Sequence, residues 1–120
     1  MYNISMNIII KKTLDVTEPL EAYIDEKLGA LGKLVARFDE AQEGGLTLRF
    51  EVARSTMHHK KGEDIFTASG SLSLPHGDVR GEGSASDVRV AIDRVRDILR
   101  EEIEKYKSKH EERYRSGKER

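Results

Sequence analysis

The sequence predicts one α+β domain of the order β-α-β-β-β-α, a four-stranded sheet with two helices packed on one face. Three observations lead to this prediction. Apolar and polar residues alternate in four segments, which is the period of a half-buried strand. In two longer segments apolar residues recur every three or four positions, which is the period of an amphipathic helix. The 120 residues contain no internal repeat, and their number suits a single domain.

The first strand is expected over residues 2–10, where Tyr2, Ile4, Met6, Ile8 and Ile10 alternate with mostly polar neighbours. Ile9, on the opposite face, predicts partial cover of that face as well.

A first helix is predicted to begin at Thr17, whose hydroxyl can cap the first turn, with Pro19 just inside it. Its apolar stripe consists of Leu20, Ile24, Leu28, Leu31, Val35 and Phe38. Gly29 and Gly32 each lower the intrinsic helicity by about 1 kcal/mol relative to Ala, so packing must compensate.

Three further strands are expected over residues 46–52, 66–74 and 79–85. Pro75 to Asp78 form a turn by composition, because Pro fixes one φ angle and Gly77 can adopt a positive one. Strands joined in this way predict an antiparallel meander with one polar face.

A second helix is predicted after Ser86, its expected N-cap, with Asp87 in the first turn, where the helix dipole favours a carboxylate. The buried stripe consists of Val88, Ile92, Val95, Leu99, Ile103 and Tyr106. No apolar period continues beyond Tyr106. We therefore expect a folded domain over residues 1–109 and a charged, disordered tail over residues 110–120.

Composition argues against several classes of function. The chain has 21 Lys and Arg and 22 Asp and Glu, a formal net charge of −1, so any basic surface must be local. The absence of Cys removes disulfides, thiol catalysis and Cys-type zinc sites. Neither a GxSxG nor a GxxxxGK[ST] motif is present. We predict a protein without enzymatic activity, cofactor, metal or small-molecule substrate.

The sequence also predicts a cytoplasmic protein. No apolar run approaches the ~18 residues of a membrane span, and the N-terminus lacks a signal-peptide pattern.

Basic residues of the second predicted helix fall along one line. At about 100° per residue, the members of this line are Arg89, Arg96, Arg100 and Lys107. Such a line suits successive backbone phosphates. The alternative is a solvated face with i,i+4 pairs such as Asp93–Arg89 and Glu101–Lys105. From Lys105 to Arg120 there are seven basic and three acidic residues, which favours an anionic partner.

Three segments, in order, match a known family. VTEPL at 16–20 leads into KLGAL at 27–31, similar to the pattern ITxALxxxxxxKxxKL. ASG at 68–70 precedes a hairpin, and DVRVAID at 87–93 resembles DMYAAID. Leu99, Lys105, Lys107 and Lys109 continue an ending of the KLxRQLxKxKxK type. Over roughly residues 3–109 the chain resembles the ribosome hibernation promoting factors, also called ribosome-associated inhibitors or sigma-54 modulation proteins.

The resemblance implies a domain similar to the double-stranded RNA-binding domain with an added first strand. It implies a factor that binds the small ribosomal subunit through 16S rRNA, blocks the channel of mRNA and tRNA, and inhibits translation under stress. It also implies a short member, without the C-terminal dimerisation domain of long members. Two other classes remain open: a general double-stranded RNA-binding module and a protein-interaction module that modulates transcription.

The residues expected to contact rRNA combine family positions with the basic line: Lys27, Arg89, Arg96, Arg100, Lys105, Lys107 and Lys109. Lys33 and Arg37 are secondary candidates. The chain departs from the family at Glu21, Ala30, Ile98 and Glu101, where the family has basic residues, and Arg89 replaces the motif tyrosine. Either the contacts have moved onto the line from Arg89 to Lys107, or the affinity for RNA is reduced.

Overall fold

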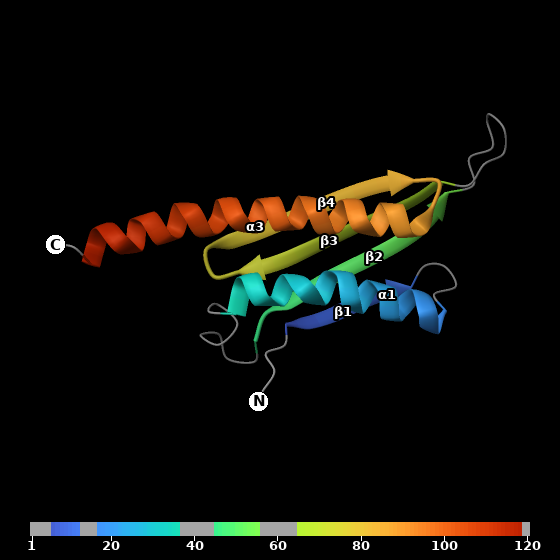
Figure 1. The fold of residues 1–120 in the computed structure, drawn as a ribbon, viewed down its shortest axis with the longest axis horizontal. Helices are drawn as coiled ribbons and strands as arrows, with labels where there is room; N and C mark the ends of the chain where they lie inside the picture. Colours follow the sequence, from blue (N-terminus) through green and yellow to red (C-terminus); the bar gives the residue numbers. More distant parts are fainter. Residues whose placement is uncertain (1–5, 13–16, 37–44, 56–64, 119–120) are drawn as a thin grey trace.

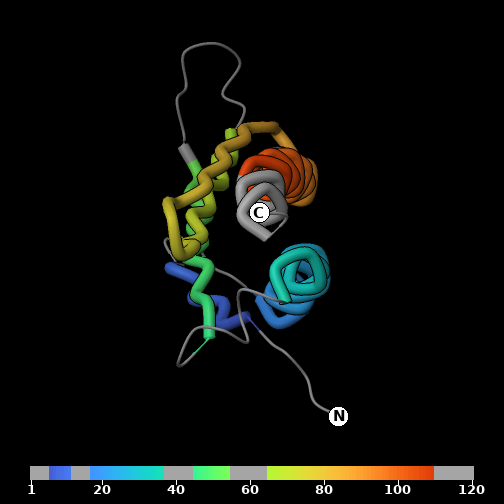
Figure 2. Tube along the Cα trace, turned by 90° about the vertical axis from the view of Figure 1, so that its left-hand side faces the viewer, coloured from blue at the N-terminus to red at the C-terminus, as the bar shows by residue number. Residues whose placement is uncertain are grey.

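One sheet covered on one face by two helices makes up the fold. The computed structural model describes residues 6–12, 17–36, 45–55 and 65–118. The sheet has the strand order β1 (Asn7–Lys12), β2 (Thr47–Ser55), β3 (Ile65–Leu74), β4 (Gly77–Ala85). Helices α1 (Glu18–Gly29) and α3 (Val88–Lys118), with a 3-10 helix η1 (Ala30–Val35), lie on the same side of it (Figures 1 and 2). The predicted α+β fold and element order are confirmed.

The sheet is mixed. β1 pairs parallel with β2, with Ile8 opposite Leu48 and Ile10 opposite Phe50. A parallel pair needs a crossover connection, and α1 with η1 provides it. β2, β3 and β4 pair antiparallel, so the predicted meander holds for these three strands.

The first strand differs from its expected bounds and exposure. It spans Asn7–Lys12, Met6 just before it is buried, and residues 1–5 lie outside the described residues. Ile9 is 52% exposed on the face opposite the helices, so the predicted partial cover there is wrong.

The first helix begins as predicted and ends earlier. The Thr17 hydroxyl accepts a hydrogen bond of 3.3 Å from the Leu20 N–H. The α-helix ends at Gly29 and the chain tightens into η1, where the low helix propensity of Gly29 and Gly32 weakens the α-helical alternative. Leu31 and Val35 are still buried, so the predicted stripe reaches the core; Phe38 lies outside the described residues.

The cap of the second helix is Asp87, which corrects the prediction of Ser86. The Asp87 carboxylate accepts from the Arg89 N–H at 2.9 Å, and the Asp87 carbonyl accepts from the Ala91 N–H at 3.1 Å. Asp combines the capping oxygen with a charge that the helix dipole favours. The α3 backbone is helical to Lys118. The division into a folded domain over residues 1–109 and a charged, disordered tail over residues 110–120 stays a prediction.

The core lies between the sheet and the helices. Its largest fully buried side chains are Phe50, Ile24, Leu28, Leu46, Leu48, Leu72, Ile92, Leu99 and Ile103. Glycines bring α3 close to β4: a Cβ at Gly83 would lie 2.7 Å from the Arg94 Cβ, and one at Gly81 would lie 3.1 Å from Ile98. The helix therefore packs against nearly bare backbone at this edge.

Candidate nucleic-acid interface

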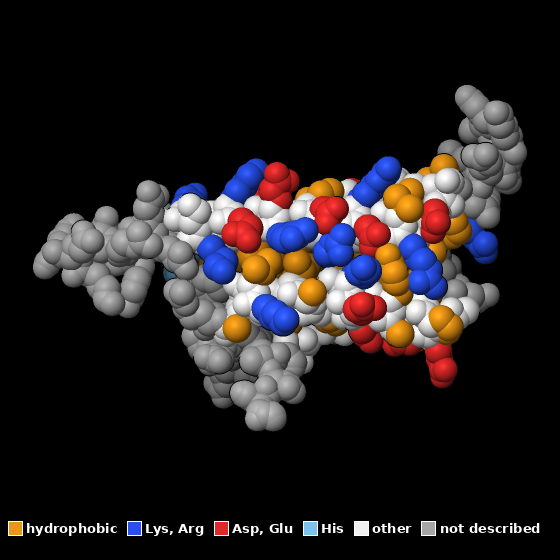
Figure 3. Space-filling model, viewed as in Figure 1, with side chains coloured by type: hydrophobic (Ala, Val, Ile, Leu, Met, Phe, Trp, Pro, Cys, Tyr) orange, Lys and Arg blue, Asp and Glu red, His pale blue; other side chains and the backbone are white. Residues whose placement is uncertain are grey.

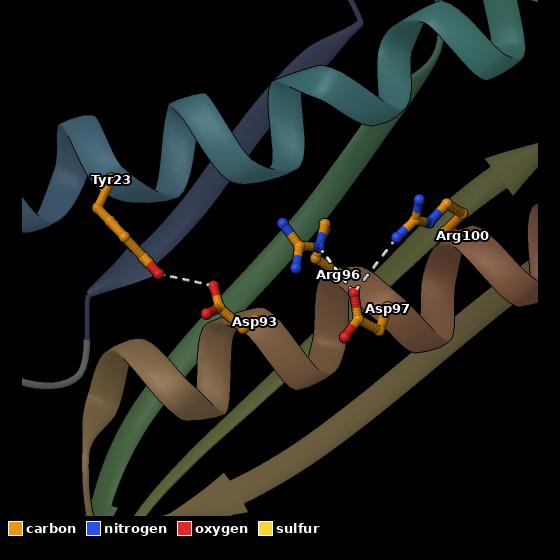
Figure 4. A network of polar contacts seen from close by, with 5 residues as sticks. All are labelled: Tyr23, Asp93, Arg96, Asp97 and Arg100. Atoms are coloured by element: carbon orange, nitrogen blue, oxygen red, sulfur yellow. Dashed lines mark hydrogen bonds and ion pairs between the residues drawn. The ribbon is translucent and has the colours of Figure 1, made fainter.

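The outer surface of the two helices carries closely spaced charges of both signs (Figure 3). We call Arg89, Arg96, Arg100 and Lys107 the arginine edge of α3. This edge faces α1, since Arg89 packs on the Tyr23 ring and Arg96 and Arg100 lie on the side of α3 toward α1 (Figure 4). The predicted basic line therefore borders the junction of two helices.

Tyr23 of α1 is the centre of a cluster that bridges the two helices. Its hydroxyl donates a 2.7 Å hydrogen bond to the Asp93 carboxylate in α3 (Figure 4). The Arg89 guanidinium lies 4.6 Å and the Lys27 ammonium 5.3 Å from the centre of its ring, within cation–π range. The structure thus brings together the family position Lys27 and the first residue of the arginine edge.

The pKa of Tyr23 reports this environment. The hydrogen bond to Asp93 raises it above the ordinary value of 10.0, and burial and the negative charge of Asp93 act in the same direction. Arg89 and Arg96 act in the opposite direction, and their influence is smaller. Tyr23 is therefore a hydrogen-bond donor at neutral pH, held between an anion and two cations.

Asp97 pairs with two members of the arginine edge. Its carboxylate lies 2.9 Å from Arg96 Nε and 3.7 Å from Arg100 Nη2 (Figure 4). The Asp97 and Arg100 side chains are 57% and 55% exposed, and Arg96 is 25% exposed. Exposed pairs of this kind contribute little to stability, so an anionic ligand can displace Asp97 at small cost.

Two of the predicted contact residues lie on a different edge. Lys105 is about 200° around the helix from Lys107, and Lys109 shares its side. Arg94, on the same side, donates to the Ser84 carbonyl, so this side of α3 borders β4. We call Lys105 and Lys109 the lysine edge. The seven predicted residues therefore do not form one surface. Lys27 lies beside the arginine edge and not beside the lysine edge.

The acidic partners differ from the i,i+4 pairs considered for a solvated face. The Asp93 carboxylate accepts a hydrogen bond from Tyr23 and does not pair with Arg89. The Lys105 ammonium lies 3.6 Å from the Glu102 carboxylate and does not pair with Glu101. Lys33 is exposed on η1, and Arg37 lies outside the described residues.

Tyr23 and Asp93 are the members of the site that sequence reasoning missed. They are separated by 70 positions, and no periodicity within one helix can pair them. The available signals were weak: Tyr23 lies beside the apolar stripe of α1, and Asp93 closes the DVRVAID segment.

The described residues contain no group of three or more potential metal ligands. Among their helices, none is both long and apolar enough to cross a membrane.

Comparison with known proteins identifies the family. Residues 7–111 match the family described as "Sigma 54 modulation protein / S30EA ribosomal protein". A ribosome hibernation promotion factor from Deinococcus radiodurans is 26% identical over 107 residues, which is 89% of this chain; the chain spans 51% of that relative's length.

Two solved structures are similar in fold. The N-terminal domain of Protein Y from Thermus thermophilus aligns with a TM-score of 0.59 at 25% identity, over 86% of this chain and 99% of that domain. A ribosomal subunit interface protein from Coxiella burnetii aligns with a TM-score of 0.63 at 14% identity, over the same shares of the two chains. Together with the family match, these findings show that the chain belongs to the sigma-54 modulation (S30AE) family of ribosome hibernation promotion factors, a non-enzymatic family.

Proposed function

We propose that this protein is a cytoplasmic translation inhibitor that binds the small ribosomal subunit through 16S rRNA and occupies the channel of mRNA and tRNA under stress. Family membership supports this proposal, and so do the names of two similar proteins, a hibernation promotion factor and a ribosomal subunit interface protein.

The observation that carries the proposal is the cationic junction of α1 and α3. Lys27 and Arg89 flank Tyr23 from two different helices, and Arg96 and Arg100 extend the charge along α3. Successive phosphates of an RNA backbone would contact these cations one after another. The formal net charge of −1 means that attraction must come from this local arrangement.

The mechanism we propose is steric. Binding in the channel excludes mRNA and tRNA, and no bond is made or broken. Affinity comes from phosphate contacts by the arginine edge and Lys27, so it should fall as the salt concentration rises.

Sedimentation tests the proposal directly. The full chain is mixed with purified 30S and 70S particles at low salt, separated on a sucrose gradient, and added in parallel to an in vitro translation reaction. We expect co-sedimentation with 30S or 70S particles and inhibition of translation. An Arg96→Glu/Arg100→Glu variant should remain in the ribosome-free fractions and leave translation unaffected.

The two other classes give different results in the same experiment. A general double-stranded RNA-binding module would bind an isolated RNA duplex as tightly as assembled subunits. A protein-interaction module would stay in the ribosome-free fractions even at low salt. Either result would overturn the proposal.

A further inference from the structure

The face of the sheet opposite the helices has a shallow depression of about 370 Å³. Side chains of all four strands line it: Lys11, Arg49, Glu51, Ser69, Ser71 and Arg80, with Ile9 beside them. No described helix lies over this face (Figure 2). The arginine edge is on the other side of the sheet, so the depression is a separate feature.

The strand register places two arginines on either side of a serine. Arg49 of β2 is opposite Ser71 of β3, which in turn is opposite Arg80 of β4. Neighbouring strands are about 4.8 Å apart, so the two arginine Cα atoms are separated by about 10 Å. Both arginines are exposed, and each stem is long enough to bring its guanidinium over Ser71. Ser69 points to the same face, two residues along β3.

The charges of the described residues that line this depression do not balance. Lys11, Arg49 and Arg80 are cations, and Glu51, opposite Lys11 in the register, is the single carboxylate among the lining residues that the structure describes. None of these three cations makes a side-chain hydrogen bond or an ion pair there, whereas Arg94, Arg96 and Arg100 on α3 all have partners. Among the lining residues two positive charges therefore remain in excess, and Glu82, opposite Ser69 in the register, is the nearest carboxylate on β4 beyond them.

This combination of groups selects a particular ligand chemistry. Guanidinium groups bind tetrahedral oxyanions through paired hydrogen bonds, and serine hydroxyls add donors between them. A dianion matches the excess of two positive charges. A carboxylate would match one arginine only.

We propose that the depression binds a phosphate group between Arg49 and Arg80, above Ser71, with Lys11 balancing the second charge when the phosphate is a dianion. The phosphate can be free phosphate or the singly charged phosphodiester of an RNA backbone, since both present non-bridging oxygen atoms to the two guanidinium groups. The site is independent of ribosome binding by the helices and can be tested without ribosomes.

The test is a two-dimensional NMR titration of the full chain with inorganic phosphate at constant ionic strength. We expect saturable shifts of the Ser69, Gly70 and Ser71 amides and of the Nε–H signals of Arg49 and Arg80. Arg49→Gln/Arg80→Gln should weaken binding at least tenfold. The matched control Arg89→Gln/Arg100→Gln removes the same charge from the helix face. It should change the phosphate affinity read from the Ser69, Gly70 and Ser71 amides less than twofold.

A second arm of the titration, with single-stranded oligouridylate, distinguishes the sources of phosphate. The same amide shifts with the oligonucleotide, abolished in Arg49→Gln/Arg80→Gln, would assign the site to an RNA backbone. Shifts with inorganic phosphate only would assign it to free phosphate. Non-saturating shifts at every basic residue, or equal weakening by both double variants, would overturn the proposal.

Discussion

The Tyr23 hydroxyl in α1 donates a hydrogen bond of 2.7 Å to Asp93 in α3. This contact joins the two helices that carry the proposed interface, and Arg89 and Lys27 pack against the ring of the same tyrosine. Cations from two different helices therefore contact one half-buried side chain.

We expect Tyr23→Phe to destabilise the fold by up to about 1 kcal/mol, the net value of a typical hydrogen bond. The phenyl ring keeps its contacts with the two cations, so the loss should come from the hydroxyl. Urea denaturation of wild type, Tyr23→Phe, Asp93→Ala and the double variant gives a mutant cycle. Additive effects of the two changes would show that the contact does not stabilise the protein.

The same contact predicts a dependence on alkaline pH. The pKa of Tyr23 is raised above 10.0, so the unfolded chain loses this proton at a lower pH than the folded chain does. The contribution is therefore complete below about pH 10 and is lost as the pH rises through the folded pKa. The free energies of unfolding of wild type and Tyr23→Phe should converge above about pH 10. A difference that stays constant up to about pH 11 would contradict this assignment.

A third prediction concerns the approach of α3 to β4. A Cβ at Gly83 would lie 2.7 Å from the Arg94 Cβ and 3.2 Å from the Ala91 carbonyl oxygen, so Gly83→Ala must displace the helix. We expect a loss of about 1–3 kcal/mol, as for other overpacked sites. Thermal and urea denaturation measure it.

Gly29→Ala is the matched control for that change. No atom lies within 4 Å of a Cβ built at Gly29, and its φ of −62° suits alanine. Because alanine favours helix over glycine, this variant should gain stability, by up to about 1 kcal/mol. The two identical substitutions should thus have opposite signs. Equal effects would show that close approach at β4 is unimportant.

The fold could be predicted from the sequence to a large extent because periodicity is a local property. The stripe from Leu20 to Val35 lies in one continuous helical segment, α1 followed by η1, and the alternation in β3 lies in one strand. Both mark the buried side chains correctly. The change from α-helix to 3-10 helix after Gly29 could not be predicted. The low helix propensity of glycine indicates that an α-helix is less favourable there, but it does not specify which geometry replaces it. The choice between Ser86 and Asp87 as the cap likewise depends on which side chain reaches the free N–H groups, and the structure shows that it is Asp87, bonded to the Arg89 N–H.

The candidate site was less predictable because it depends on which helix lies beside which. Periodicity placed Arg89, Arg96 and Arg100 on one line, and the structure places that line against α1. The Tyr23–Asp93 contact arises only when the two helices pack on one sheet. Helix geometry alone places Lys105 and Lys107 on different sides of α3. The family pattern nevertheless led to the prediction that both contact rRNA.

A fourth prediction concerns the end of the chain. Tyr106 is the last residue of the predicted α3 stripe and is buried, and its hydroxyl accepts a 3.0 Å hydrogen bond from the His76 N–H in the turn between β3 and β4. Removal of residues 110–120 leaves this contact intact, so the melting temperature should change by no more than a degree or two. A drop of several degrees on truncation would show that residues beyond Lys109 stabilise the domain.

The last prediction decides between the arginine edge and the lysine edge as the rRNA contact. Arg96→Glu/Arg100→Glu and Lys105→Glu/Lys109→Glu make the same change of charge on opposite sides of α3. Each lost phosphate contact should flatten the slope of log K against log salt by about 0.9, so two lost contacts flatten it by about 2. We expect this flattening, with a sharp loss of affinity for 30S subunits, for the arginine pair only.

The reason for this expectation is the position of Lys27. Lys27 packs on Tyr23 beside Arg89, so an RNA strand that contacts Lys27 also contacts the arginine edge. Lys105 is on the other side of α3, toward β4. Binding to purified 30S subunits at several salt concentrations measures both variants, and circular dichroism checks that each is folded. Neither should lose much stability, since exposed charges contribute little to folding. Equal losses would mean diffuse attraction without a defined edge. A loss confined to the lysine pair would place the contacts at the family positions and leave Arg96 and Arg100 as a solvated pair around Asp97.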